Sequence, residues 1–600
     1  MRTAPTTSRS LLVVLALVCI TAILSVQGLW HGADGAGWKQ TIRSDAKGYY
    51  GYLQAIFIRH DLGHEAFVAE YTQHTPTGTL NKYFCGTSLM MAPWFGIGHA
   101  LAIQDPDHPQ DGTSAHEQKA ISAGAWVYLL LGLLALRALL LGLGVRDGIV
   151  AWTLAGLALG TPLIQYAAMQ PGWSHVYSFC VVSGFLLAVH HIATTGPRSW
   201  TIAAAVLLAI IILIRPVNAL VLLAVPIVAG DQTLSLIKGL LQRYLTFLVA
   251  VLVFGAIVAL QPLLWHAQTG NWAEWGYQGE GFHWNRPEIV KVLFGFRRGL
   301  FLWTPLMLLV ALGTLAIWRS DRWRSAWTMV YWMVCTYIIS SWWTWYYGGG
   351  FGSRVYIDHY PVLVVPMVLM LQRWGDRTWM LARVFVVGCI ALNLAQLWQY
   401  HNGFIHHECM DREKYVYSFL RFDDAHKDRL GGNYQTAPFN PNGMDMILEE
   451  TCGMDDTCTY WSRGKRVQWE GAHTPSTVCL FDRWTEFGIL FQADTDTLPV
   501  GRALFLEVGL QRFDAQHEGS LPALGVTQVR NAEDSVYFYE PFPLDPLPGK
   551  PGVWEQIEYR IPVPPLSKGD ELSFYFWNKE GRSAFLIDDV FMRVSAVRPY

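Results

Sequence analysis

Long apolar stretches recur along the first two thirds of this chain of 600 residues, and they constrain its fold more than any other feature. A helix that crosses a bilayer needs about 20 mostly apolar residues with few or no charges. The first stretch, from Leu11 to Val26, has no charged residue, and similar stretches continue to about Gln396. The sequence therefore predicts a polytopic α-helical membrane protein.

The apolar stretches define about eleven candidate transmembrane helices. They lie at about 10–28, 118–141, 148–167, 174–192, 199–215, 217–230, 243–262, 300–317, 325–341, 358–372 and 378–397. The first comes after two arginines as a secretory signal would, but no convincing cleavage site comes after it, so we interpret it as a retained anchor. The fifth and sixth are short and separated by Arg215-Pro216, so they could be one broken helix and a re-entrant piece.

Composition agrees with this interpretation and excludes one class of partner. Apolar residues make up 52% of the chain and charged residues 15%, against about 25% charged residues in soluble domains. The net charge of −3 excludes a strongly basic nucleic-acid-binding protein, and no nucleic-acid motif is present. After about residue 396 charges recur every few residues, so a polar part of about 200 residues comes after the membrane part.

Basic residues fall in alternate connections between the predicted spans. They are Arg137, Arg146, Arg198, Lys238, Arg243, Arg319, Arg322, Arg324, Arg373 and Arg377. Because short basic loops stay on the cytoplasmic side, we expect a multi-pass inner (plasma) membrane protein with a cytoplasmic N-terminus and a periplasmic or extracellular C-terminal domain. The close spacing of Cys452 and Cys458 predicts a local disulfide there. A zinc site is the weaker alternative, because neither cysteine has a C-x-x-C partner.

The connections on the opposite side are long and rich in aromatic residues, histidine and glycine. They are 30–117, 168–173, 263–299, 342–357 and 398–600. Connections this long and patterned are seldom simple linkers. Within the first, Leu53–Ile58 and Cys85–Leu101 are helix-like and suit helices at the bilayer surface. We therefore place a functional face on the outer side.

One outward loop combines glycines with aromatic residues. The segment Trp342–Arg354 has four glycines, and Asp358 comes after it at the membrane boundary. Glycines permit tight backbone paths and close approach to a ligand, while aromatic rings can stack on sugars or sit among headgroups. An interfacial aromatic belt would explain the rings but neither the glycine run nor the Arg354/Asp358 pair.

Two further charged residues stand out. Arg215 ends an apolar run near the outer end of its span, where an unpaired cation is costly and usually functional. Snorkelling to the headgroups is the simpler explanation, and a lipid phosphate gripped by the guanidinium is the specific one. Asp45 lies early in the first outward segment, after Ser44. A helix cap would account for it as well as a catalytic role would.

These features together resemble the GT-C superfamily of integral-membrane glycosyltransferases, in particular the protein O-mannosyltransferase and aminoarabinose-transferase branch. The resemblance covers about residues 10–400. It depends on a first span before a long outward loop with an early Asp45, on Ser174-His175, on Arg215-Pro216, and on the Trp/Tyr-Gly-Ser-Arg loop that ends at Arg354.

The resemblance implies transfer of a sugar from a polyprenyl-phosphate donor to a glycan, lipid or protein acceptor on the outer face. Asp45 would be the general base that takes the acceptor's proton. Arg215 and Arg354 would stabilise the developing charge of the leaving phosphate, with Lys47 a further candidate. Single displacement, which the family also implies, would invert the anomeric carbon.

Three more residues complete the candidate substrate-binding set. His175 could orient the acceptor or the donor phosphate, although an interfacial histidine with ordinary partners would look the same. Tyr50 belongs to the set because it follows Asp45 and Lys47 closely, and Asp358 because it lies four residues after Arg354 at the membrane boundary.

A divalent metal is the one cofactor to consider, since some members of the superfamily use an Asp-x-Asp element. Asp105 and Asp107 have that spelling, with His108 and His116 nearby. The element comes late in the first outward segment rather than beside the first span, so we interpret it as a solvated loop and assign no metal.

The C-terminal part has the alternation of an antiparallel β-sandwich. Short apolar–polar runs lie at 487–491, 503–508, 535–539, 554–559 and 572–577, separated by turn residues, and Phe585–Val594 resembles the last strand of jelly-roll carbohydrate-binding modules. The predicted domains are a transmembrane domain at 1–400 with outward loops 30–117, 263–299 and 342–357, a mixed connector at 401–470, and a jelly-roll-like β-sandwich at 471–600.

Three other functions compete with a transferase. A carrier or flippase for a lipid-linked saccharide would also need these charges and rings, but it should show internal repeats, and none is visible. A polysaccharide polymerase or ligase of related architecture is a variant of the enzyme hypothesis. A mere anchor for a glycan-binding domain would need one or two spans rather than eleven.

Overall fold

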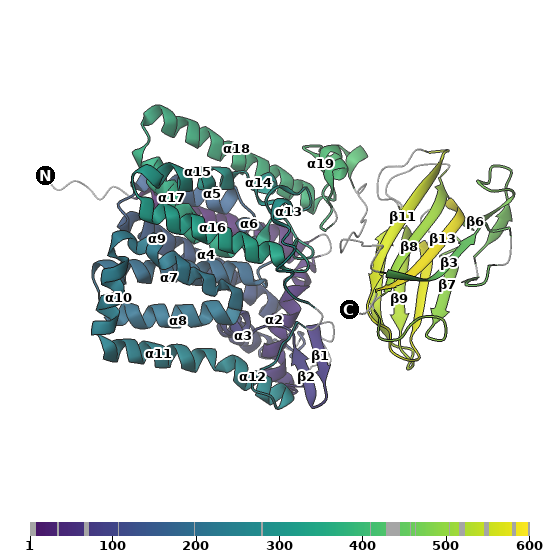
Figure 1. Cartoon of the computed structure of the whole chain (residues 1–600), viewed down its shortest axis with the longest axis horizontal. Coiled ribbons are helices and arrows are strands. Elements are labelled where there is room, and N and C mark those ends of the chain that lie inside the picture. Colours follow the sequence, from purple (N-terminus) through teal and green to yellow (C-terminus); the bar gives the residue numbers. More distant parts are fainter. Residues whose placement is uncertain are drawn as a thin grey trace. The chain divides into compact units, whose positions relative to one another are not determined.

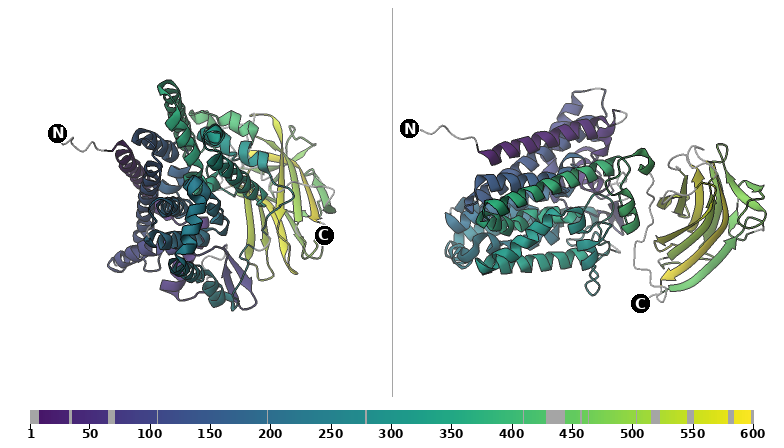
Figure 2. Two further views of the ribbon diagram at one scale, coloured as in Figure 1. Left: turned by 60° about the vertical axis from the view of Figure 1, so that its left-hand side comes forward. Right: turned by 90° about the horizontal axis from the view of Figure 1, so that it is seen from above.

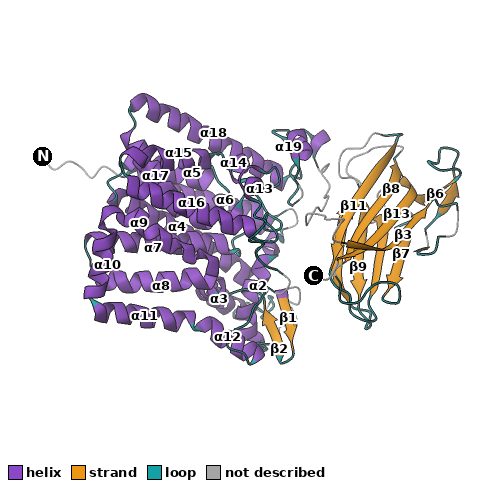
Figure 3. Ribbon diagram, in the orientation of Figure 1, coloured by secondary structure: helices purple, strands orange, loops and turns teal. Residues whose placement is uncertain are grey.

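The computed structural model describes the chain apart from residues 1–7, 33–34, 65–70, 106, 197, 278–279, 409, 428–443, 456–457, 463, 503, 515–522, 545–550, 579–583 and 598–600. It divides into two compact units. The first comprises residues 1–347 and 351–395, and the second comprises 348–350 and 396–600. Figure 3 shows that the first is built of helices with one small hairpin and that strands dominate the second.

The helical unit is a bundle of long apolar helices with short helices between them (Figure 1). Its elements are α1 (Arg9–Leu24), η1 (Ser25–His31), η2 (Gly37–Gln40), α2 (Asp45–Gln54), η3 (Ala55–Arg59), β1 (Thr72–Thr75), β2 (Gly78–Asn81), α3 (Gly86–Ile103), α4 (Ala115–Gly142), α5 (Asp147–Leu159), α6 (Leu163–Ala168), α7 (Ser174–Thr194), α8 (Arg198–Ile214), η5 (Pro216–Ala224), α9 (Val225–Ala229), η6 (Gly230–Gln232), α10 (Thr233–Gln242), α11 (Tyr244–Val258), α12 (Leu260–Thr269), α13 (Ile289–Phe294), α14 (Leu300–Trp303), α15 (Leu306–Ala316), η7 (Ile317–Arg319), α16 (Arg322–Ser341), η8 (Arg354–His359), α17 (Tyr360–Arg373) and α18 (Asp376–His401).

The helices confirm the prediction of a polytopic membrane protein. Seven helices of the described chain are long and apolar enough to cross a bilayer: Arg9–His31, Ala115–Gly142, Ser174–Thr194, Pro216–Gln242, Tyr244–Thr269, Arg354–Arg373 and Asp376–His401. The shorter apolar helices α5, α8 and Leu306–Arg319, together with α16, coincide with the other four predicted spans. α11 is apolar all round, and Ala250 is its one buried residue. Such a surface is stable against lipid rather than water.

The break predicted at Arg215-Pro216 is present, but the helical stretch after the break is longer than expected. α8 ends at Ile214, and Arg215 is extended, with φ −153° and ψ 117°, before Pro216 opens η5. Proline suits the first position of a helix because its missing N–H would have no partner there. The helical stretch then continues through η5, α9, η6 and α10 to Gln242, and by length and composition it is long enough to cross a bilayer.

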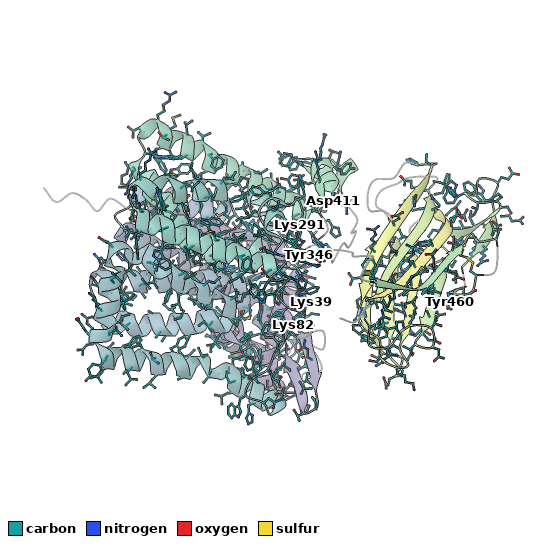
Figure 4. All side chains as sticks on the ribbon, in the orientation of Figure 1. Lys39, Lys82, Lys291, Tyr346, Asp411 and Tyr460 are labelled. Atoms are coloured by element: carbon teal, nitrogen blue, oxygen red, sulfur yellow. A yellow bond between two sulfur atoms is a disulfide. The ribbon has the colours of Figure 1, made fainter. Side chains whose placement is uncertain are left out.

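Three predicted outward loops gather at one end of the helical bundle. α2, the hairpin β1–β2, α12 and α13 all lie there (Figure 1), and the two further views agree (Figure 2). Lys39, Lys82, Lys291 and Tyr346, one or more from each of the three loops, are labelled at this end in Figure 4. Segments far apart in the sequence therefore build one face.

The second unit confirms the predicted β-sandwich. One sheet has the strand order β10-β9-β12-β7-β4, and the other has β11-β8-β13-β6-β5 with β3 also paired to β13. The elements are α19 (Arg412–Ser418), η9 (Asp424–His426), β3 (Met444–Cys452), β4 (Trp461–Ser462), β5 (Arg466–Gln468), β6 (Thr477–Phe481), β7 (Phe487–Asp494), β8 (Leu504–Phe513), β9 (Ala523–Arg530), β10 (Val536–Pro543), β11 (Trp554–Val563), β12 (Glu571–Asn578) and β13 (Phe585–Val597).

Alternate residues of these strands form one apolar core between the sheets. Phe574 of β12 and Val594 of β13, from opposite sheets, both belong to it, as expected when side chains alternate between the two faces of a strand. The disulfide predicted between Cys452 and Cys458 is present.

Candidate active site

Asp45 is the first residue of α2, and its carboxylate is held by residues from distant parts of the chain. The Tyr83 hydroxyl donates to Oδ1 at 2.9 Å, and a guanidinium nitrogen of Arg354 donates to Oδ2 at 2.9 Å. The preceding Ser44 has a left-handed φ of 52° and makes no side-chain cap bond. These contacts favour a binding or catalytic site over a simple helix-capping role for Asp45. The Asp45 side chain keeps 19% of its surface exposed, so small polar groups can reach it.

The environment of Asp45 keeps it ionised at neutral pH. Burial raises the pKa of its carboxyl, but the charge of Arg354, the hydrogen bond from Tyr83 and the charge of Arg215 together lower it by more. The pKa of Asp45 is therefore lowered from its ordinary value. The carboxylate can accept a proton, and it is a weaker base than an isolated aspartate.

Arg354 is oriented from three sides. Besides its bond to Asp45, it donates to the Tyr347 carbonyl at 2.6 Å, and its guanidinium lies 4.2 Å from the centre of the Trp173 ring. Its side chain is 8% exposed. The glycines that precede it allow the backbone to turn sharply, because Gly348, Gly350 and Gly352 have φ values of 63°, 143° and 60°. Side chains other than glycine are strained in such conformations.

A second arginine–carboxylate pair involves Asp358, which lies one turn beyond Arg354 in η8. Its carboxylate is 1% exposed, lies 3.6 Å from a guanidinium nitrogen of Arg215, and accepts from Asn218 at 2.9 Å. His175 Nδ1 lies 3.1 Å from its other oxygen. Every oxygen of Asp358 thus has a partner, whereas the Arg215 side chain remains 20% exposed.

His175 is completely buried and is positioned by Asp358. Because the Asp358 carboxylate can only accept, we assign the hydrogen to Nδ1, which leaves a lone pair on Nε2 when the ring is neutral. Among the described residues, Nε2 has no hydrogen-bond partner.

α2 connects the two pairs. Burial raises the pKa of Tyr49, one turn after Asp45, and the charge of Arg215 opposes that rise while the charge of Asp45 adds to it. Both charged groups are therefore close to the same hydroxyl. Two glycines permit the close packing: a Cβ on Gly48 would lie 2.2 Å from the Tyr83 ring, and one on Gly172 would lie 2.7 Å from the Thr41 carbonyl oxygen.

The structure thus brings together five of the candidate residues: Asp45, Arg354, Arg215, Asp358 and His175. The other two are placed differently. Tyr50 is buried and uses its hydroxyl on the Gly112 carbonyl at 2.7 Å. Lys47, two residues after Asp45, is partly exposed.

Three neighbours of the site were not assigned a role from the sequence. Tyr83 holds Asp45, Asn218 holds Asp358, and Trp173 supports Arg354. Asn218 lies three residues after Arg215, and Trp173 lies two residues before His175. Proximity to the Arg215-Pro216 and Ser174-His175 motifs could therefore have identified both residues. No sequence signal distinguishes Tyr83 from other tyrosines.

An apolar groove lies beside η8. It has a volume of about 740 Å³ and is lined by Trp284, Ile289, Leu293, Phe301, Trp332, Met333, Val334, Thr336, Tyr337 and Ile338. Trp284 is 49% exposed and Met333 63% exposed, so the groove opens at the surface of the bundle. Thr336 in its wall bonds the hydroxyl of Tyr356 at 3.0 Å. Tyr356 belongs to η8, so the wall of the groove is bonded to the helix that carries Arg354 and Asp358.

No family model and no curated protein matches the sequence. Two solved membrane transferases are similar in structure. The archaeal oligosaccharyltransferase AglB from Archaeoglobus fulgidus, solved with an inhibitory peptide and a dolichol-phosphate, has 10% identity and a TM-score of 0.34 over 68% of this chain and 54% of its own. The arabinosyltransferase EmbB from Mycobacterium smegmatis has 13% identity and a TM-score of 0.32 over 100% of this chain and 66% of its own.

A third similar structure is a xylan-binding domain, CBM22-1 of Xyn10C from Paenibacillus barcinonensis. It has 15% identity and a TM-score of 0.19 over 26% of this chain and 98% of its own. Similarities with TM-scores this low do not establish a function. We therefore build the functional proposal on the geometry of the site.

Proposed function

We propose that this chain is a membrane glycosyltransferase that moves a sugar from a polyprenyl-phosphate donor to an acceptor hydroxyl on the outer face of the inner membrane. The observation that carries the proposal is the cluster in which the partly exposed carboxylate of Asp45 meets Arg354 beside the Arg215–Asp358 pair. It offers a proton acceptor next to two cations, which is what transfer away from a phosphate requires.

Asp45 acts as the general base. The acceptor oxygen attacks the anomeric carbon, its proton passes to the Asp45 carboxylate, and the bond from that carbon to the phosphate oxygen breaks. The bonding electrons leave with the polyprenyl phosphate, and the anomeric carbon inverts. A carboxylate with a lowered pKa suits this role if proton transfer is late, when the attacking oxygen has become strongly acidic.

The arginines stabilise the leaving phosphate, which gains one negative charge as the sugar departs. Arg215 is the more accessible cation, and its 3.6 Å approach to Asp358 leaves guanidinium hydrogens for a phosphate. A donor phosphate that also bonds Arg354 draws that cation away from Asp45. The pKa of Asp45 then rises, so donor binding itself prepares the base.

The apolar groove suits the donor's isoprenoid chain. Its lining is almost entirely apolar, and Thr336 in its wall bonds Tyr356 of η8, the helix that also carries Arg354 and Asp358. A lipid chain in the groove would hold its phosphate at the arginines. The buried His175 supports this arrangement through Asp358, which in turn pairs with Arg215.

The test is a transfer assay in purified membranes with a panel of radiolabelled polyprenyl-phosphate sugars, comparing the wild type, Asp45→Asn and Asp107→Asn. Asparagine keeps the shape of Asp45 and can still accept from Tyr83, but it cannot take a proton. Asp107 is an exposed aspartate of the same outward loop and serves as the matched control. We expect turnover to fall about 10²- to 10⁴-fold in Asp45→Asn and to stay unchanged in the control.

Full transfer by a well-inserted Asp45→Asn protein would remove Asp45 as the base. A wild type that binds donors without transferring sugar to any acceptor, but moves them across vesicle membranes, would instead identify a lipid-linked saccharide carrier.

A further inference from the structure

A second polar cluster lies in the loop that joins α3 to α4, outside the Asp45 site. The sequence there spells Asp-x-Asp, but the structure does not pair the two aspartates. Asp107 is exposed, and its backbone N–H donates to Asp105 Oδ1 at 3.2 Å. The residues that meet Asp105 are instead His108, three positions later, and His116, in the first turn of α4.

The donor atoms of these three side chains converge. His108 Nδ1 lies 3.0 Å from Asp105 Oδ2, and His116 Nε2 lies 2.9 Å from the same oxygen. All three donor atoms lie within 4.8 Å of one another. Zinc ligands at about 2.0–2.1 Å from the ion stand about 3.4 Å apart in a tetrahedron. Small side-chain rotations would therefore suffice to place an ion between them.

The charge of the loop favours a cation. Between Gln104 and Gln118 the chain has Asp105, Asp107, Asp111 and Glu117 and no lysine or arginine. The Asp105 and His116 side chains are 34% and 31% exposed, so an ion can reach them from solvent.

We propose that Asp105, His108 and His116 form a binding site for one zinc-type divalent transition-metal ion. Two imidazole nitrogens and one carboxylate oxygen suit zinc, whereas magnesium and calcium prefer oxygen ligands. Three protein ligands leave a fourth position for water. The site goes beyond the proposed transferase function and does not depend on it.

Such an ion would stiffen the support of the Asp45 helix. Within the same loop, the Gly112 carbonyl accepts from Tyr50 and the Asp111 carbonyl accepts from Gln54 at 2.9 Å. Both partners lie on α2, which begins at Asp45. An ion that joins His108 to His116 would fix the segment between them, and that segment supplies both of the carbonyls that bond α2.

The experiment is calorimetric titration of zinc into the full-length protein in detergent, after removal of metal with a chelator. We expect one zinc ion to bind the wild type at micromolar or lower free concentration. Asp107→Asn, the matched control from the same loop, should bind equally well. Asp105→Asn and His116→Ala should bind at least about 10- to 100-fold more weakly, the loss that even outer-shell changes cause.

Thermal unfolding gives a second readout that does not require activity. Zinc should raise the midpoint of the wild type and of Asp107→Asn but leave those of Asp105→Asn and His116→Ala unchanged. Magnesium at the same concentration should shift none of them. The proposal is overturned if the wild type binds no zinc at micromolar concentration, or if both ligand variants bind it as the wild type does.

Discussion

Asp45 and Asp358 each meet an arginine in the helical unit, but the two pairs are built in opposite ways. Asp45 keeps 19% of its side chain exposed while its partner Arg354 is 8% exposed. Asp358 is 1% exposed while its partner Arg215 is 20% exposed. In the first pair the carboxylate is accessible, and in the second the cation is.

This difference assigns different roles to residues of the same type. A carboxylate that exchanges a proton with a substrate must be reached by it, and Asp45 satisfies that condition. Asp358 has partners on both oxygens, so in the proposed reaction we expect it to position Arg215 and His175. In the same proposal, Arg215 is the cation that an arriving anion meets.

The sharpest test of the comparison is the stability of Asp358→Asn against that of Asp45→Asn. An asparagine at position 358 turns an NH2 group toward a buried donor, either His175 or Asn218, and breaking a buried charged network in this way costs about 3–5 kcal/mol. We expect a loss of that order in Asp358→Asn and a smaller loss in the more exposed Asp45→Asn. Denaturant unfolding in detergent measures both. Equal losses would contradict the distinction between an accessible and a buried carboxylate.

Arg215 should matter for turnover. The measurement needs protein that still folds and inserts, because Arg215→Ala also removes the cation that pairs with the buried Asp358. Removing a group that stabilises developing charge typically lowers turnover about 10²- to 10³-fold, and we expect this of Arg215→Ala. Arg215→Lys should recover only part of it, because an ammonium keeps the charge without the paired hydrogen bonds. Transfer kinetics at saturating donor would show the loss. Turnover unchanged in Arg215→Ala would mean that the exposed cation only reaches toward lipid headgroups.

Close packing around Asp45 can be tested at a glycine. In Gly48→Ala the new Cβ would lie 2.2 Å from the Tyr83 ring, so the ring must move and its bond to Asp45 must weaken. Overpacking of this kind costs about 1–3 kcal/mol. The matched control is Gly255→Ala on α11, where no atom lies within 4 Å of the new Cβ. The midpoint of thermal unfolding should fall for Gly48→Ala and stay level or rise for the control.

The smallest expected effect is a shift in pH dependence. The lowered pKa of Asp45 means that its ionised form contributes stability above the unfolded pKa of about 3.9, and that this stability is lost as the pH falls through the lower folded pKa. Catalysis by the ionised form should fade in the same direction. In Arg354→Gln the lowering of the Asp45 pKa by Arg354 is gone, so the acid limb of kcat/KM should move to higher pH. A limb that stays in place would show that Asp45 is not the group that titrates.

The sequence was sufficient for the helices and for most of the site's residue types, because both are local signals. The apolar runs located the spans, and short motifs singled out Asp45, Arg215 and Arg354. The partners were not predictable, since Asp45 and Arg354 are 309 positions apart in the chain. Pairing at such a separation is decided by how the helices pack, and packing leaves no local pattern.

Two details show where local reasoning failed for a physical reason. The sequence favoured a solvated loop at Asp105 and Asp107 and assigned no metal there, and it gave no sign that the backbone N–H of Asp107 turns back onto Asp105. Its place is taken by His116, which the start of α4 brings within 2.9 Å. Similarly, the alternation typical of strands is clear from about residue 475 onward, whereas β3 at Met444–Cys452 has a polar and mixed pattern because it lies at the edge of its sheet beside β13.

Two helices have their N-termini at the site, and this affects the electrostatic potential there. α2 begins at Asp45 and α7 begins at Ser174, next to His175. Aligned peptide dipoles give the first turn of a helix roughly half a positive charge. Two aspartates and two arginines cancel formally, but the backbone adds a positive potential that no change of pH can remove. An anion arriving there is attracted even while both arginines are still paired.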